Sequence, residues 1–297
     1  MKKYTNICKE EISLKCALGE SPVWDSDSQT LNFVDINSNI LFRYKDQKFC
    51  KPYYTSNELN AVCLSNFFDN LLLTNKNSIS SFNFSSRKFD YIKHNYCETI
   101  NNRFNESKVD SRGRLWFASM DKNEIRPTGA LWSYEHLEKK FVKHFDGFVI
   151  GNGIDWNLDD TKMYFTDSVN GIIYTFDYDP DYGILGERKV FAKIDPSLGY
   201  PDGLTVDAEG FVWSAIWDGW CIIRFSPDGI IDRLIKLDFP RPTSLAFGGK
   251  DMNKLFITSA RTGLTKKEIK SAPKSGSLFS IETDFLGRQP YKFGARF

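Results

Sequence analysis

The sequence predicts an all-β protein, a six-bladed β-propeller with four antiparallel strands in each blade. Similar segments recur six times, and their starts lie roughly 40 to 50 residues apart, the range of propeller repeats. Within each repeat, apolar and polar residues alternate with the period of a strand, and no segment carries a sustained helical stripe. A large β-sandwich would also contain frequent hairpins, but it does not require this long repeat, so the pattern favours the propeller.

Each repeat opens with a polar stretch followed by an apolar, strand-like run. A polar turn and a second strand follow, as in 25–35, 157–167 and 207–215, and this succession is typical of hairpins. The six opening runs are Ser21-Pro-Val-Trp-Asp, Asn60-Ala-Val-Cys-Leu, Ser107-Lys-Val-Asp-Ser, Gly153-Ile-Asp-Trp-Asn, Gly203-Leu-Thr-Val-Asp and Ser244-Leu-Ala-Phe-Gly.

The chain is expected to form one domain, residues 1–297. No Pro-, Ser- or Gly-rich linker and no block of charge divides it, and closed β architectures of this length often form a single domain. Hydrophobic residues make up 41% of the chain and aromatic residues 15%, which is ample for packing between blades. The 39 Lys and Arg nearly balance the 38 Asp and Glu, so we expect neither nucleic-acid nor membrane binding.

The N-terminus and the cysteines indicate the cellular compartment. The first residues are basic, but the apolar core of an export signal does not follow, and no run of roughly 18 apolar residues would span a bilayer. We therefore expect a cytoplasmic protein. The six cysteines are scattered without a CxxC motif, so we expect free thiols rather than zinc ribbons or disulfides. No sequence feature indicates an oligomeric state.

Three polar stretches place an oxygen donor just before the apolar run of a repeat. They are Gly19-Glu20-Ser21-Pro22, Gly151-Asn152-Gly153 and Pro201-Asp202-Gly203. If the repeats surround an axis, residues at equivalent steps face it at the same height, so Glu20, Asn152 and Asp202 would converge on one hard cation. Their oxygens suit Ca²⁺, Mg²⁺ or Mn²⁺. Taken singly, each residue could instead be an ordinary turn residue.

Other chemistries fit the sequence poorly. The three histidines, His94, His136 and His144, do not stand before a repeat or beside a second ligand at metal spacing, which argues against a His-rich zinc site. There is no Gly-x-Ser-x-Gly motif of a Ser-His-Asp hydrolase. The glycines between 147 and 153 lack the Lys-Ser/Thr pair and the following helix of a phosphate loop.

The seven tryptophans have two expected roles. Trp217 and Trp220 flank a turn and are candidates to line a pocket. The other five fall at matching strand positions and are expected to pack between blades rather than to form a sugar platform; they are Trp24, Trp116, Trp132, Trp156 and Trp213.

Nine short segments form an ordered series from about residue 14 to residue 260. They are Gly19-Glu20-Ser21-Pro22-Val-Trp, Asn102-Arg103-Phe104-Asn105-Glu106-Ser-Lys-Val-Asp, Gly129-Ala-Leu-Trp, Asn152-Gly153-Ile-Asp-Trp, Tyr164-Phe-Thr-Asp, Phe176-Asp-Tyr-Asp, Pro201-Asp202-Gly203-Leu, Asp207-Ala-Glu-Gly and Ala246-Phe-Gly-Gly. Together they resemble the family of senescence marker protein, gluconolactonase and regucalcin, which includes luciferin-regenerating enzyme-like proteins. One tripeptide would carry no weight, but nine in order are specific.

Members of that family are six-bladed propellers with one divalent metal in the central channel, and characterised members hydrolyse sugar lactones. The resemblance implies that Glu20, Asn152 and Asp202 are metal ligands and that Asp202 is also the general base. It further implies that Arg103 and Asn105 hold substrate oxygens, with Asn105 close to the metal. The expected activity is therefore divalent-metal-dependent hydrolysis of a sugar lactone to its sugar acid, with Ca²⁺, Mg²⁺, Mn²⁺ or Zn²⁺ as the cofactor.

One position departs from the family pattern. Many animal members carry a Glu that contacts substrate, shortly after the Met of the segment that corresponds to Ala118-Ser-Met120 here. When residues are counted without gaps, the position of that Glu is occupied by Asn123, which is followed by Glu124. An amide can bind a sugar hydroxyl but cannot act as an acid or base, so the change bears on substrate preference and substrate binding. The polar segment 121–129 is expected to form a loop over the channel mouth.

The competing interpretation is a non-catalytic propeller that binds calcium or a protein partner, with the same ligands used structurally. Arg103 and Asn105 favour the enzyme, because a structural ion needs no cation beside it, whereas a substrate with carboxylate character does. A lone Arg more often pairs with a carboxylate, and Asp110 is the candidate partner.

Overall fold

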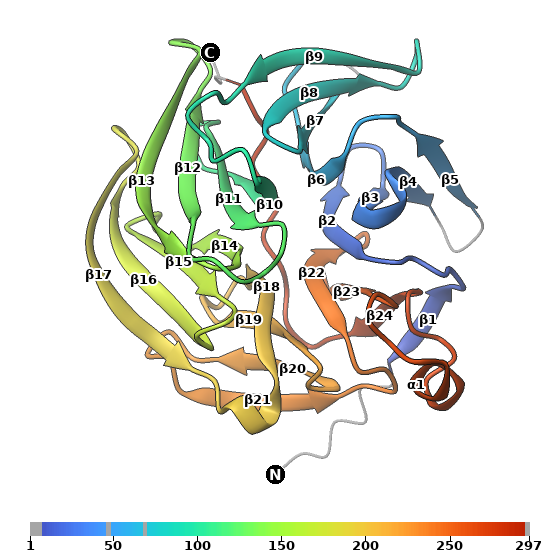
Figure 1. The fold of residues 1–297 in the computed structure, drawn as a ribbon. Helices are drawn as coiled ribbons and strands as arrows, with labels where there is room; N and C mark the ends of the chain where they lie inside the picture. The colour runs from blue at the N-terminus through green and yellow to red at the C-terminus, as the bar shows by residue number, and fades with distance from the viewer. Residues whose placement is uncertain (1–7, 46–48, 68–69, 295–297) are drawn as a thin grey trace.

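Six four-stranded antiparallel sheets stand around a common axis (Figure 1) in the computed structural model, which describes residues 8–45, 49–67 and 70–294. The prediction of a six-bladed propeller with four strands in each blade is confirmed. Residues 1–7, which bear on the expected absence of an export signal, lie outside the described residues. Of the residues that the structure describes, none forms a helix with the length and apolar character that crossing a bilayer requires.

The first five blades are each built from four consecutive strands, and the innermost strand comes first. Blade 1 has β2 (Gly19–Asp25), β3 (Thr30–Asp35), β4 (Ile40–Lys45) and β5 (Phe49–Tyr54), and blade 2 has β6 (Leu59–Leu64), β7 (Asn70–Asn75), β8 (Ser78–Asn83) and β9 (Lys88–His94). Blade 3 has β10 (Asn102–Val109), β11 (Leu115–Asp121), β12 (Gly129–Glu135) and β13 (Lys140–Phe148). Blade 4 has β14 (Gly151–Trp156), β15 (Lys162–Asp167), β16 (Ile172–Asp179) and β17 (Ile184–Lys193), and blade 5 has β18 (Tyr200–Val206), β19 (Val212–Trp217), β20 (Cys221–Phe225) and β21 (Ile231–Lys236).

The sixth blade joins the two ends of the chain. It contains β22 (Pro242–Gly248), β23 (Lys254–Ser259) and β24 (Leu278–Glu282), and its outermost strand is the N-terminal β1 (Lys9–Ile12). Figure 1 shows the blue β1 beside the red β24, with which it pairs in antiparallel register. The repeat pattern did not predict this closure, because the repeats begin only at β2. Pairing the first strand with the last blade fixes the ring without any covalent link.

Helical structure is confined to short connections in the described residues. Two 3₁₀ turns, η1 (Ile36–Ser38) and η2 (Pro196–Leu198), join strands or blades, and α1 (Lys266–Ser271) lies between β23 and β24. Thr265 begins α1 with a capping box, in which its hydroxyl accepts the amide of Glu268 and the Glu268 carboxylate accepts the amide of Thr265.

Aromatic side chains fill the space between blades, as the sequence predicted. Trp24, Trp116, Trp132, Trp156 and Trp213 are all buried. Two of them also bond to a residue that directly follows an innermost strand. Asp110, after β10, accepts the indole N–H of Trp116 at 3.0 Å, and Asp207, after β18, accepts that of Trp213 at 2.8 Å. All six cysteines are free thiols, in agreement with the sequence.

A C-terminal strap, residues 284–294, crosses one end of the central channel. In Figure 1 the red segment runs across the middle of the ring. Its backbone bonds to blade 6 (Gly287 N to Met252 O, 2.7 Å), blade 5 (Ala208 N to Leu286 O, 2.8 Å), blade 2 (Phe293 N to Leu64 O, 2.9 Å) and blade 3 (Gly294 N to Gly113 O, 3.1 Å). The strap was not predicted from the sequence, because it belongs to no repeat.

Phe293 anchors this strap. It is fully buried among Tyr134 and other residues of blades 2 and 3. Phe293→Ala should lower the free energy of unfolding by about 3 to 5 kcal/mol, because a large buried ring is replaced by a cavity. Leu286→Ala, at an exposed strap position, should change it by no more than about 0.5 kcal/mol. Urea unfolding followed by tryptophan fluorescence measures both, and equal effects would contradict this anchoring role.

Candidate metal centre and substrate cavity

Every innermost strand contains a β-bulge near its start. The pairing register shifts between Glu20 and Val23, Leu59 and Ala61, Phe104 and Ser107, Gly151 and Ile154, Pro201 and Leu204, and Pro242 and Leu245. A bulge leaves residues unpaired and turns side chains out of the regular alternation, which is why bulges are frequent beside functional sites. The same bulge therefore recurs six times around one axis, and a bulge can direct side chains into the channel.

The three expected ligands line one cavity. Glu20, Asn152 and Asp202 are all buried, at 7%, 5% and 5% exposure, and all three border an open cavity of about 650 Å³ at the starts of the innermost strands. Their structural steps are not identical, however. Asn152 and Asp202 are unpaired residues within their bulges, whereas Glu20 is the last paired residue before the bulge of β2. The Glu20 side chain nevertheless reaches the same cavity.

The carboxylates of Glu20 and Asp202, both buried at this cavity, are costly to ionise as they stand. Burial raises the pKa of Glu20 well above its usual range, and the charge of Asp202 raises it further. Burial likewise raises the pKa of Asp202, and the charge of Glu106 adds to this effect. No ion pair among the described residues involves Glu20 or Asp202. A cation between them would stabilise both charged forms.

The unused hydrogen-bonding capacity of these residues fits such a cation. Oδ1 of Asp202 is buried and has no hydrogen-bond partner. The Asn152 amide nitrogen is 3.3 Å from Ser168 Oγ, and Asn152 also donates a hydrogen bond that lowers the pKa of Asp202. Because both contacts use the amide nitrogen, the carbonyl oxygen of Asn152 stays available as a ligand. Two carboxylates and one carbonyl are a donor set for a hard divalent ion, with water completing its coordination.

Glu20, Asp202 and nearby acids do not form a cage of charged ligands. Within 8–45, 49–67 and 70–294, no group of three or more His, Cys, Asp or Glu side chains is arranged to hold one metal ion. The candidate set contains only two carboxylates, and its third protein ligand is an amide. The site is therefore open, with room for solvent or substrate beside the ion.

Arg103 and Asn105 stand at the same cavity, on β10. The guanidinium donates to Asn105 Oδ1 at 2.7 Å and to the carbonyl of Phe104 at 3.0 Å, and Asn105 Nδ2 donates to the carbonyl of Gly151 at 3.0 Å. Asn105 is an unpaired residue of its bulge, as Asn152 and Asp202 are. These bonds fix Arg103 and Asn105 beside the candidate ligands.

Asp110, the alternative partner considered for Arg103, forms its hydrogen bonds with other residues. Its carboxylate accepts Arg114 at 3.2 Å, Trp116 Nε1 at 3.0 Å and the Tyr178 hydroxyl at 2.6 Å. The proposed pairing of Arg103 with Asp110 is therefore wrong. Burial lowers the pKa of Arg103, and Glu124 and Glu20 are the largest charges that oppose this effect. Arg103 consequently offers donors to the cavity.

The loop between β11 and β12 lies over this cavity, as the sequence predicted for 121–129. Lys122 and Glu124 line the cavity, but Asn123 does not and is exposed. The Asp121 carboxylate shapes the loop by accepting the amide of Arg126 at 2.9 Å. Glu124 has φ +57°. The carboxylate facing the cavity from this loop is thus one residue beyond the position obtained by counting without gaps.

Several cavity residues were not assigned from the sequence. Lys122 pairs with Glu58 at 2.8 Å, and Arg241 pairs with Asp218 at 2.5 Å while stacking over the Trp217 ring at 4.7 Å. Trp217 lines the cavity as expected, whereas Trp220 does not and is 41% exposed. Lys122 and Arg241 come from loops or blade ends, where no repeat pattern marks them.

Comparison with known proteins gives a consistent result along the chain. The family model described as "SMP-30/Gluconolactonase/LRE-like region" matches residues 18–261. Regucalcin of Xenopus laevis is 34% identical over 273 residues, covering 89% of this chain and 90% of that protein.

Solved structures agree with this match. A luciferin-regenerating enzyme superposes with a TM-score of 0.89 at 26% identity, covering 97% of this chain and 99% of that one. A calcium-binding protein, regucalcin, from Agrobacterium tumefaciens gives a TM-score of 0.92 at 22% identity, with 97% and 98% coverage, which shows the shared fold.

The raised pKa values make a prediction for the metal-free protein. A carboxyl group whose folded-state pKa is raised stabilises the fold below its unfolded pKa of about 4, and this stabilisation is lost as pH rises through the folded pKa. Urea unfolding with a chelator should therefore show stability falling as the pH rises from about 4 through the raised folded-state pKa values, by up to about 1.4 kcal/mol per pH unit for each such carboxyl. Glu20→Gln should have a shallower slope. Equal slopes would contradict the assignment to Glu20.

Proposed function

The chain belongs to the SMP-30/gluconolactonase/LRE-like family, and on this basis we propose that it hydrolyses sugar lactones to the corresponding sugar acids with one divalent cation. The observation that carries this proposal is the shared cavity of Glu20, Asn152, Asp202, Arg103 and Asn105. In it, candidate cation ligands stand beside donors that suit substrate oxygens. Ca²⁺, Mg²⁺, Mn²⁺ or Zn²⁺ could complete the site.

Glu20, Asn152 and Asp202 would hold the cation. When bound, the cation would supply Lewis-acid chemistry at the lactone carbonyl. The carbonyl oxygen of Asn152 and the unpartnered Oδ1 of Asp202 are the atoms that the protein leaves free for this purpose. The bulges and the buried setting keep these oxygens in place before any ligand arrives, so little reorganisation is required on binding.

Asp202 would act as the general base. It takes a proton from a water molecule as the water oxygen attacks the carbonyl carbon, and the ring C–O bond then breaks. The departing ring oxygen takes that proton back from Asp202 and becomes a hydroxyl, and the new carboxylic acid releases its own proton to solvent and leaves as a carboxylate. This sequence consumes one water molecule and requires no oxidant or reductant. Desolvation already makes Asp202 a more basic group than an exposed Asp.

Arg103 would orient the substrate. Its guanidinium is held by Asn105 and by the Phe104 carbonyl, and it has no carboxylate ion-pair partner among the described residues. A planar fork of donors suits ring hydroxyls and the developing carboxylate. This arrangement favours an enzyme over a propeller that only stores calcium, because a stored ion gains nothing from an adjacent cation.

Asp202→Asn tests the proposed base. The variant keeps an oxygen for the cation but cannot accept a proton, so kcat for hydrolysis of gluconolactone should fall by at least about 100-fold. Proton release in weakly buffered solution measures the rate, with and without each divalent ion. Calorimetric titration of the same ion should show that Asp202→Asn still binds it.

Asp195→Asn is the matched control. Asp195 is an exposed cap of η2 outside the cavity, so this variant should retain the wild-type rate. Unchanged hydrolysis by metal-loaded Asp202→Asn would contradict its role as base. A wild-type protein that binds Ca²⁺ but hydrolyses no sugar lactone would instead support the calcium-binding alternative.

Glu124 rather than Asn123 should affect substrate binding. A charged hydrogen bond to a sugar hydroxyl contributes about 1.5 to 3 kcal/mol, so Glu124→Gln should raise KM about 10-fold or more. Asn123→Ala should change KM less than about 2-fold, because Asn123 does not line the cavity. Steady-state kinetics on one lactone compares the two. A larger rise in KM for Asn123→Ala than for Glu124→Gln would contradict this prediction and show that Asn123 is the residue that binds substrate.

A further inference from the structure

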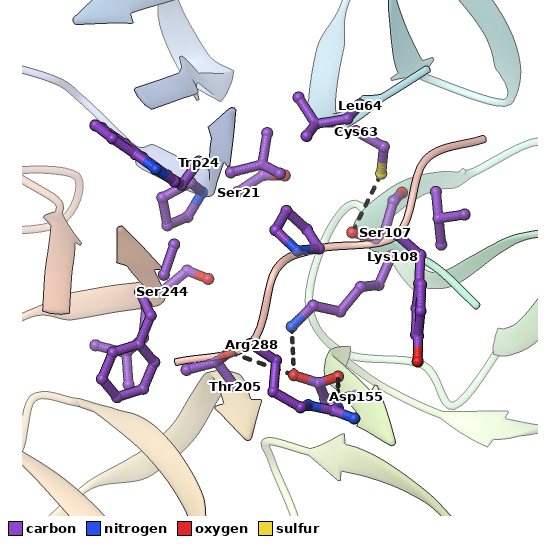
Figure 2. A pocket seen from close by; sticks show the side chains of 18 of the residues that line it. Ser21, Trp24, Cys63, Leu64, Ser107, Lys108, Asp155, Thr205, Ser244 and Arg288 are labelled. Atoms are coloured by element: carbon purple, nitrogen blue, oxygen red, sulfur yellow. Dashed lines mark hydrogen bonds and ion pairs between the residues drawn. The ribbon is translucent and has the colours of Figure 1, made fainter. Parts of the chain in front are cut away.

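The channel contains a second, smaller chamber of about 90 Å³ on the side of the C-terminal strap (Figure 2). Lys108 of β10 and Arg288 of the strap both donate to Asp155, at 2.8 Å and 3.3 Å. The amide of Val206 donates to the same carboxylate at 2.9 Å. This network ties the strap to the blades, and its structural role accounts for these charged groups. The larger cavity, by contrast, has a wall that the proposed mechanism does not use.

That wall is formed by two aromatic side chains. Tyr200 begins β18 and Trp217 ends β19, and both residues line the larger cavity. They are direct cross-strand partners, so their side chains leave the same face of the blade. Tyr200 is 45% exposed, so it retains apolar surface that a ligand could cover. Ligand cavities are usually lined by such aromatic surface together with a few polar groups that fix the orientation of the ligand.

The aromatic wall of Tyr200 and Trp217 adjoins the candidate base. Tyr200 precedes Asp202 by two residues on β18, which is roughly 7 Å of extended chain. Arg103 lines the same cavity from blade 3. A lactone whose carbonyl lies at Asp202 would therefore have its ring within reach of the aromatic wall and of the Arg103 donors. A sugar ring presents C–H groups on its faces and hydroxyls around its edge, so it is complementary to both kinds of surface.

Arg241 braces Trp217 from the neighbouring blade. It directly precedes β22, and its guanidinium carbon lies 4.7 Å from the centroid of the Trp217 ring. The guanidinium also donates twice to Asp218, at 2.5 Å and 3.2 Å, and once to the carbonyl of Thr262. Its side chain is only 13% exposed. Because a two-point bond to a carboxylate fixes the plane of a guanidinium, Arg241 offers a rigid surface to the Trp217 ring.

The turn that follows Trp217 is strained. Asp218 and Trp220 have φ values of +58° and +55°, a backbone conformation that residues with a Cβ rarely adopt and that is least favourable for a bulky side chain. Such strain persists only where surrounding contacts hold it, and it is frequent beside ligand sites. The bonds from Arg241 to Asp218 are contacts of this kind. They fix the turn directly after the ring that lines the cavity.

We propose that Tyr200 and Trp217 bind the C–H face of the lactone ring, and that Arg241 is a positioning residue that acts by holding Trp217 in this wall. The inference rests on the proposed function, because it assigns how the substrate lies in the same cavity. The aromatic wall is remote from the reacting carbonyl, so it favours the bound substrate and the transition state equally. Loss of the wall should therefore raise KM and leave kcat nearly unchanged.

Trp217→Ala tests the aromatic wall. With the divalent ion that supports wild-type hydrolysis, KM for gluconolactone should rise about 10-fold or more, while kcat stays within about 3-fold of the wild-type value. Trp217→Phe retains a ring and should keep KM within about 3-fold. Trp220→Ala is the matched control, because Trp220 lies in the same turn but does not line the cavity; its KM should change less than about 2-fold. Proton release in weakly buffered solution measures all rates.

Arg241→Met tests the brace. KM should rise about 5-fold, and Trp217→Ala/Arg241→Met should have the KM of Trp217→Ala alone, because a brace has no effect once the ring is gone. Arg233→Met is the matched control. Arg233 pairs with Asp232 at 2.9 Å and lies over the Phe285 ring at 4.5 Å, but it does not line the cavity, so KM should stay at the wild-type value.

The outcomes separate this inference from the proposed function. If the wild-type protein hydrolyses the lactone and Trp217→Ala leaves KM unchanged, the role of the aromatic wall is overturned while the proposed function stands. If Arg241→Met lowers the melting temperature without raising KM, or if its effect on KM adds to that of Trp217→Ala, its positioning role is overturned. If the wild-type protein hydrolyses no sugar lactone with any of the ions, the proposed function and this inference are both overturned.

Discussion

Two carboxylates buried in one cavity cannot both be charged at low energetic cost without a cation between them. Glu20 and Asp202 are in this situation, since each is about 95% buried and neither has an ion-pair partner among the described residues. A protein could remove the repulsion by replacing one acid with an apolar residue. This chain retains both acids and places the carboxamide of Asn152 beside them, an arrangement that is unfavourable without an ion and suited to holding one.

The propeller scaffold makes that arrangement possible. Six innermost strands run around one axis, each has a bulge near its start, and bulge residues of β10, β14 and β18 line the cavity. Pairing of β1 with β24 closes the ring, and the C-terminal strap bonds to blades 2, 3, 5 and 6 across one end of the channel. The loop 121–129 borders the cavity of Glu20, Asn152 and Asp202, whereas the strap residues Arg288 and Tyr291 line a separate, smaller chamber.

The sequence was most informative where the repeats are regular. The six runs beginning at Ser21, Asn60, Ser107, Gly153, Gly203 and Ser244 all fall in innermost strands, and Glu20, Asn152 and Asp202, which directly precede three of them, line the cavity. Predictions were less complete where non-local contacts decide the structure. The pairing of β1 with β24 joins chain ends that share no repeat, and the strap belongs to no blade. Counting without gaps aligned the family's substrate-contacting Glu with Asn123, but it is Glu124 that lines the cavity.

The central claim is that Glu20, Asn152 and Asp202 meet at one cation, and anomalous X-ray diffraction from crystals grown with Mn²⁺ tests it most directly. The account predicts one strong anomalous peak in the cavity, within about 2.0 to 2.6 Å of an oxygen from each of the three side chains. A peak bound by other residues, or no peak in the cavity at an occupancy that calorimetry shows to be saturating, would contradict it.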